Sequence, residues 1–301
     1  MPPNINLNSL PPQALKRIES SKNSNVSSSL LGIGSHLSIE SSGFTPVGEV
    51  MGCIVQSIGF MGYAGCGWYG YGAPPPRTII CRPDQGGQWQ ALGPYLYAVN
   101  NGYNTAIGRM LTEAHALGAD GVVGVTIKET RFEDGYREYM ALGTAVRSSG
   151  SIHLQFPFTT LLTGNEVTKL TQSGWMPKAI IVVISLGIRH NDYYTRMATR
   201  SFGANAEVPG HTDLLNSIRN EVRNQISSQV NHIGADGAIL SDQIRTEIHH
   251  LEAGEGHQDM LGMAHLMGSA IVKFDTHKDL KIGNSTPTVL SLKSLGRKTL
   301  K

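Results

Sequence analysis

ALGADGVVGV, residues 116–125, decides the fold, because one element ends in it and another begins. Gly118 can adopt the left-handed conformation that stops a helix. The valine-rich run after Asp120 is typical of a strand. The tetrapeptide Gly118-Ala119-Asp120-Gly121 recurs as Gly234-Ala235-Asp236-Gly237. We interpret each copy as the junction between a long helix and a strand.

An amphipathic helix is predicted before each junction. Its apolar residues recur every three or four positions, which places them on one face. The two sets correspond in order: Ala106, Met110, Ala114 and Leu117 match Val222, Ile226, Val230 and Ile233.

Two further signatures occur twice in the same order. Residues 42–46 (SGFTP) and 173–177 (SGWMP) each open a strand-like run, while GTAV from Gly143 and GSAI from Gly268 each close one. The order in each half is strand, variable insert, long helix and two-stranded hairpin. We therefore predict an α/β protein of the α+β type, in which each of two repeats packs a long helix on a short, mainly antiparallel sheet.

The repeats set the predicted domain boundaries. Residues 31–150 form the first repeat, and residues 151–274 form the second repeat with its linker. Residues 1–30, rich in Ser, Asn and Pro, are expected to be a flexible tail, although residues 10–18 could form a short helix. Residues 275–301 are a basic tail with six basic and two acidic side chains.

Composition limits the class of protein. Charged residues make up 16% of the 301, against about 25% in ordinary soluble proteins. The net charge of +2 gives no reason to expect a nucleic-acid partner. Three cysteines, an odd number, indicate a reducing compartment, and no apolar run is long enough for a membrane span. We expect a cytoplasmic protein. The 35 glycines exceed the usual share of about 7%.

These motifs resemble the YbjQ-like family, whose name carries a heavy-metal-binding label. The resemblance rests on the strand-opening Gly-Phe/Trp-x-Pro, the helix end ALGADGVVGV and the closing GTAV. It is close in residues 96–148 and looser in residues 212–274. It implies a small dodecin-like α/β domain that assembles as a five-fold ring through its sheets, with no established reaction and no ligand set that maps onto this chain.

Residues 59–72 interleave glycines with aromatic side chains. They contain a G-x-G-x-x-G pattern, but three prolines follow where a nucleotide site needs a helix N-terminus, so we reject nucleotide binding. We expect either a mobile loop or a subunit-contact loop. The candidate contact residues are Phe60, Tyr63, Trp68, Tyr69 and Tyr71.

A second candidate site lies in the hairpin near residue 254. If Glu252 faces His257, then His250 faces Asp259, and alternation places all four on one side. Two imidazoles and two carboxylates could hold Zn or another divalent ion. The alternative is a solvent-exposed polar tip without metal, and no cofactor is firmly predicted.

No catalytic motif was found. Asp120 and Asp236 recur just after a helix end, where an Asp most often binds nearby backbone N–H groups. We therefore expect a non-enzymatic, ring-forming homo-oligomer that serves as a structural or binding module, whose tails could contact another protein. The alternatives are a metal-binding protein that uses the second hairpin and an enzyme of unrecognised class.

Overall fold

The computed structural model describes residues 10–23, 28–58, 78–81, 92–132, 135–151, 153–190, 192–200, 205, 207–241, 244–252 and 258–274. The elements are α1 (Pro12–Asn23), α2 (Ile33–Ser41), β1 (Phe44–Ser57), β2 (Ile79–Cys81), α3 (Leu92–Ala116), β3 (Gly121–Arg131), β4 (Tyr136–Ser148), β5 (Phe158–Thr159), α4 (Gly164–Gln172), β6 (Trp175–His190), α5 (Tyr193–Arg200), α6 (Pro209–Ile233), β7 (Gly237–Leu240), β8 (Arg245–Glu252) and β9 (Gln258–Lys273). The predicted α+β fold is confirmed.

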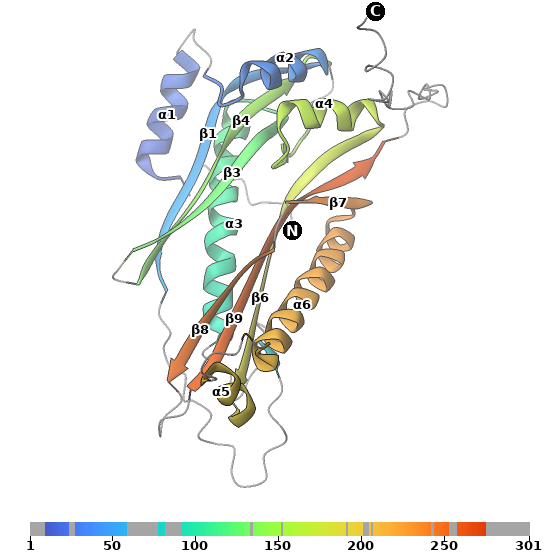
Figure 1. Cartoon of the computed structure of the whole chain (residues 1–301). Helices are drawn as coiled ribbons and strands as arrows, with labels where there is room; N and C mark the ends of the chain where they lie inside the picture. Colours follow the sequence, from blue (N-terminus) through green and yellow to red (C-terminus); the bar gives the residue numbers. More distant parts are fainter. Residues whose placement is uncertain are drawn as a thin grey trace, which may run out of the picture.

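The first sheet has the strand order β1-β4-β3-β5, and α3 packs on one of its faces (Figure 1). β1 and β3 pair antiparallel with β4, whereas β5 pairs parallel with β3. Gly52 of β1 lies directly under the helix, because a Cβ there would collide with the backbone oxygen of Ala106. The glycine therefore lets α3 lie close to the sheet.

The second sheet is built on β9. This strand pairs with β6 along one edge, and with β7 and then β8 along the other. Short β2 extends the sheet beyond β6. α6 covers one face with a single apolar stripe at helical spacing. The buried apolar side chains of that stripe are Leu214, Ile218, Val222 and Ile226.

The two halves share local backbone details. The first long strand of each half has a register shift directly after a proline, at Pro46 and at Pro177. Gly118 and Gly234 both follow their helix with a positive φ, +70° and +66°, as predicted for helix stops. β3 has a register shift, and its two parts on either side of the shift both pair with β4. In the same way, β7 and β8 both pair with β9.

Gly143 and Gly268 occupy the central strands of their sheets. A Cβ on Gly143 would lie 2.7 Å from Cγ1 of Val122, and one on Gly268 would lie 2.8 Å from the backbone oxygen of Ile239. Each glycine therefore lets the neighbouring strand approach closely.

α3 lies between the two sheets. In β6, Val182, Ile184 and Leu186 belong to the same apolar core as α3, while the alternating residues Ile181 and Val183 belong to the core under α6. The layers therefore run first sheet, α3, second sheet, α6 (Figure 1).

The short helix predicted within residues 10–18 of the N-terminal tail is present, and it extends further, to Asn23. These residues contain α1, whose Leu10, Ala14 and Ile18 are buried against the end of α3. Arg17 forms a 3.1 Å ion pair with Glu113, a carboxylate only 3% exposed. Residues 1–9, 24–27 and the basic end at 275–301 lie outside the described residues.

The expected linker at residues 151–172 contributes ordered elements. It supplies β5 to the first sheet, and α4 then packs against α2. A capping box starts α4: the backbone N–H of Thr163 donates to Glu166 at 2.8 Å. The linker is thus part of the contact between the halves.

Candidate functional site

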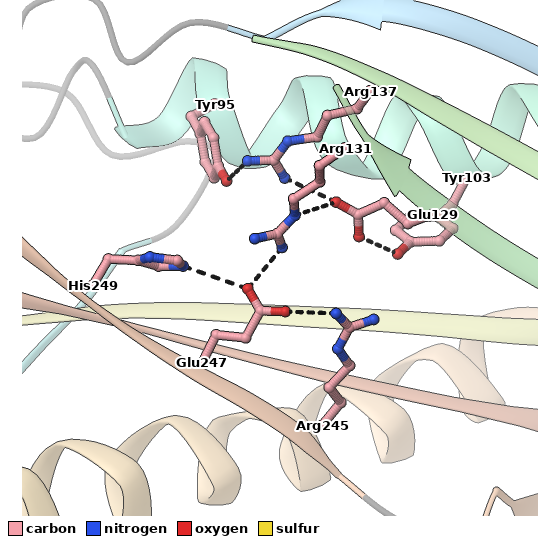
Figure 2. A network of polar contacts seen from close by, with 8 residues as sticks. All are labelled: Tyr95, Tyr103, Glu129, Arg131, Arg137, Arg245, Glu247 and His249. Carbon is pink, nitrogen blue, oxygen red and sulfur yellow. Dashed lines mark hydrogen bonds and ion pairs between the residues drawn. The ribbon is translucent and has the colours of Figure 1, made fainter. Parts of the chain in front are cut away.

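A cluster of polar side chains lies between α3, the first sheet and β8 (Figure 2). On β3 and β4, positions that face α3 carry charged residues next to the apolar core. On β8, Glu247 pairs with Met263, which belongs to the core shared with α3. The members are Tyr95, Tyr103, Glu129, Arg131, Arg137, Arg245, Glu247 and His249.

Glu129 is the acceptor at the centre of the cluster, and its side chain is only 3% exposed. It accepts hydrogen bonds from the hydroxyl of Tyr103 at 2.8 Å, Nε of Arg131 at 3.2 Å and Nη1 of Arg137 at 3.1 Å. Burial alone would raise the pKa of Glu129, but the Tyr103 hydrogen bond and the two arginines lower it below its ordinary value. Glu129 is therefore ionised at neutral pH.

Arg137 connects this carboxylate to α3. Its guanidinium lies over the ring of Tyr95, 5.2 Å from the centroid, and Nη2 donates to the Tyr95 hydroxyl at 2.6 Å. Burial raises the pKa of Tyr95, so the phenol stays protonated.

Arg131 joins the two halves of the molecule. While Nε binds Glu129, Nη2 donates to Oε2 of Glu247 on β8 at 2.7 Å. Arg245 adds a 2.9 Å ion pair to Glu247, and Nε2 of His249 lies 3.4 Å from it. Burial would raise the pKa of Glu247, but the hydrogen bond from Arg131 contributes to lowering it.

His265 lies beside the cluster on β9. Its ring centroid is 6.3 Å from that of Tyr103, and Nε2 is buried without a hydrogen-bond partner. Burial lowers the pKa of His265 to about 4. The imidazole is therefore neutral at pH 7.

The charged and hydroxyl groups of the cluster are paired with one another. Three guanidinium groups surround two carboxylates, and both carboxylates have a lowered pKa. A carboxylate of this kind is a weak general base at neutral pH. The arrangement suits a polar clamp between the two sheets better than proton transfer.

The Asp of the repeated tetrapeptide binds backbone amides in both halves. Asp120 is 2% exposed, and it accepts hydrogen bonds from the N–H groups of Ser148 and Leu154, both at 2.8 Å. Asp236 accepts one from the N–H of Lys273 at 2.8 Å. Both aspartates therefore bind backbone N–H groups, as expected from the sequence. The amides belong, however, to the neighbouring strand and the segment after it.

The first tetrapeptide lies in a segment that matches a known family, and so do the first-half residues of the cluster. Residues 86–149 match the YbjQ family model, described as "Putative heavy-metal-binding". The resemblance predicted from the sequence is confirmed for this YbjQ segment. A UPF0145 protein of Helicobacter hepaticus is 38% identical over 53 residues, 18% of this chain and 52% of that protein.

A longer match covers most of the chain. An encapsulin nanocompartment protein of Mycobacterium tuberculosis is 29% identical over 239 residues, 77% of this chain and 82% of that protein. This similarity includes sequence on both sides of the YbjQ segment. Among the described helices, none is both long and apolar enough to cross a bilayer.

The expected register of the second hairpin is wrong. His250 pairs with Met260, and Asp259 pairs with Leu251, one residue away from the predicted pairing. Because side chains alternate along a strand, His250 and Asp259 point to opposite faces. Nδ1 of His190 on β6 lies 2.8 Å from Asp259.

The other predicted metal ligands do not complete a site. Glu252 pairs with Gln258, and His257 lies outside the described residues. His250 instead lies beside His211 of α6, with ring centroids 6.2 Å apart. Across the part of the chain that the structure describes, no three His, Cys, Asp or Glu side chains are grouped as metal ligands.

The predicted contact loop cannot be placed. Phe60, Tyr63, Trp68, Tyr69 and Tyr71 all lie outside the described residues. Of the cysteines, Cys53 is half-buried and its thiol donates to Glu138 at 3.3 Å. Burial raises the pKa of Cys81 to about 12. Neither thiol is a reactive thiolate at neutral pH.

Sequence reasoning missed the polar cluster because its members come from both halves. One signal was present: Glu129, Arg131 and Arg137 occupy the side of the predicted hairpin that should face the helix. Charged residues at inward positions indicate buried partners. The partner Glu247 could not be identified without knowing that β8 lies next to Arg131 of β3.

Proposed function

We propose that this protein is the subunit of a ring-like homo-oligomer in which each chain supplies two YbjQ-like units, and that it acts as a structural or binding module. The observation that carries the proposal is the internal contact between the halves. α3 of the first half covers a face of the second sheet, and β5 from the second half extends the first sheet. The two units therefore pack through unlike surfaces, head to tail.

Head-to-tail packing leaves one surface of each kind without a partner among the residues that the structure describes. Contacts of this type form rings when the rotation closes. The similarity to the encapsulin nanocompartment protein of Mycobacterium tuberculosis supports an assembling subunit, since its name describes an assembled compartment.

A non-enzymatic role fits the polar cluster. Its carboxylates are occupied by arginine and tyrosine donors, and the Asp of each tetrapeptide is occupied by backbone amides. These groups hold elements together. Metal binding by the second hairpin loses its main support, because the register separates His250 from Asp259.

Sedimentation velocity on the full chain tests the proposal. We expect one species heavier than the 32.4 kDa monomer at micromolar concentration, unchanged by EDTA. A monomer over the whole concentration range would overturn the proposal, and dissociation by EDTA would favour a metal-linked assembly.

A further inference from the structure

The internal contact contains a strand addition that can be traced bond by bond. Residues 158–162 run along the outer edge of β3, in parallel. The N–H of Thr160 donates to the backbone oxygen of Val122 at 3.0 Å, and the N–H of Gly124 donates to that of Leu162 at 2.9 Å. The second half thus supplies the last strand of the first sheet.

The same segment is also held to its own half. The N–H of Leu161 donates to Oγ of Ser269 on β9 at 3.0 Å, and the hydroxyl of Thr160 lies 2.9 Å from the same oxygen. Residues 158–162 therefore connect the sheets of the two halves.

The first half has a counterpart of this segment. The N–H of Leu30 donates to Oγ1 of Thr144 on β4 at 3.0 Å. Thr144 follows Gly143 as Ser269 follows Gly268, and α2 begins three residues after Leu30 as α4 begins three residues after Leu161. Residues 28–31 are thus placed on their sheet as residues 159–162 are placed on theirs, but Leu30 is 47% exposed.

The second half has a counterpart of the receiving edge. β7 follows the second tetrapeptide as β3 follows the first, and in the described part of the chain it pairs only with β9. Ile239 and Leu240 of β7 are 37% and 44% exposed, whereas Val123, which matches Ile239, is fully buried. Among the described residues, no strand covers in the second half the edge that β5 covers in the first.

α2 presents a second open surface next to residues 28–31. Within the chain, α2 packs on the side of α4 that contains Gly164 and Thr168, and Thr168 donates to the backbone oxygen of Ser38 at 2.8 Å. The matching positions on α2 are Ile33 and Leu37, which are 84% and 61% exposed. These larger apolar residues would hold a second helix at wider spacing.

We infer that residues 28–31 of one copy add as a parallel strand to β7 of a second copy, while Ile33 and Leu37 of the first copy contact α4 of the second. In the register of the internal contact, the N–H of Ser29 donates to the backbone oxygen of Ala238. The N–H of Leu240 then donates to the backbone oxygen of Leu31. This inference rests on the proposed homo-oligomer and names its interface.

A second copy is the occupant because this chain contains both complementary parts. Thr144 holds residues 28–31 on the first sheet, while β7 lies at the edge of the second sheet beyond β9 (Figure 1). The two surfaces therefore meet only between copies. Each copy would give one segment and receive one, which continues the internal contact in the same direction.

Cysteine cross-linking tests the register. In the internal contact Val122 pairs with Thr159, so Ser28→Cys combined with Ala238→Cys should form disulfides between copies. We expect a ladder of covalent multimers on a non-reducing gel. Each single variant should remain without the ladder, as should Ser28→Cys combined with Asn220→Cys on the exposed side of α6.

A charge substitution tests the helix contact. Ile33→Asp combined with Leu37→Asp should raise the protein concentration at which the oligomer dissociates to monomer at least tenfold. The circular dichroism spectrum should stay unchanged. Met197→Asp on α5, which is 52% exposed, should leave assembly unchanged. An intact oligomer without the ladder would overturn this interface alone, whereas a monomeric wild type would overturn the proposed function as well.

Discussion

The helices α3 and α6 are equally long, at 25 residues each, yet thirteen residues of α3 are buried and only five of α6. The difference follows from position, because α3 has a sheet on either side and α6 has one. Tyr103 of α3 lies where Arg219 lies in α6, and Arg219 is half-buried and donates to Thr246. Within the described part of one chain, α3 therefore lies between two layers, whereas α6 has a layer on one side only.

The halves also exchange bulk between helix and strand. In the first half, Gly102 on the helix leaves room for Tyr139 on β4. In the second half, the matching positions carry Ile218 on the helix and Ala264 on β9, both in the core under α6. In each half, only one of the two facing positions carries a large side chain: the strand position in the first half and the helix position in the second. A residue of one half therefore does not fit at the matching position of the other.

The largest effect is expected at the centre of the polar cluster. Glu129→Thr places there the residue that the second half has at Thr246, and it leaves Arg137 without its carboxylate. Removing one partner of a buried ion pair costs about 3–5 kcal/mol, so the urea midpoint should fall strongly. Glu49→Gln, at an exposed position of β1, is the control. Equal stability of the two variants would contradict a buried ion-pair cluster that holds the sheets together.

A second exchange should cost almost as much. Gly52→Val installs the residue that the second half has at Val183, and its side chain would collide with the backbone of α3. Because backbone cannot move as a side chain can, we expect a loss of about 3 kcal/mol, the upper end for overpacked cores. Gly48→Ala, whose Cβ would lie 3.6 Å from Leu117, should change little in thermal unfolding.

The third test concerns pH. The pKa of His265 is lowered from 6.5 to about 4 in the folded protein, so the unfolded chain binds more protons between these values. Stability should therefore fall as the pH drops from 6.5 towards 4, by up to about 3 kcal/mol. His265→Met, which copies Met140 of the first half, should reduce this slope, and the part that remains comes from His211, whose pKa burial also lowers. Glu129 and Glu247, whose pKa values are lowered, add losses as the pH falls through about 4.5, in both proteins.

The smallest difference is expected between the two tetrapeptides. Asp120→Ala orphans two backbone amides at a buried site and should cost about 2 kcal/mol, whereas Asp236→Ala orphans one at an exposed site and should cost less than about 1 kcal/mol. Urea denaturation followed by circular dichroism measures both. Equal losses would show that the two junctions do not differ in the way the hydrogen bonds indicate.

Local chemistry made much of the fold predictable. Gly118 and Gly234 stop their helices through backbone conformation, and the apolar spacing up to Leu117 and Ile233 identified one helix face. These features depend on neighbours in the chain. The α+β fold followed from them, as did the order of helix and strands in each half.

Features that depend on distant contacts were missed. A short helix was predicted within residues 10–18, but its packing against the end of α3 was not. The hairpin register is set by the whole length of β9 against β8, and a guess from the turn alone was one residue off. Arg131 was visible as a charge on a strand, but its bond to Glu247 exists only because the halves pack together.

The most direct test of the central claim, that the contact within one chain is repeated between chains, is the native mass spectrum of the purified full-length protein. We predict one dominant species with the mass of two or more 32.4 kDa chains. A dominant signal at the mass of a single chain would contradict it.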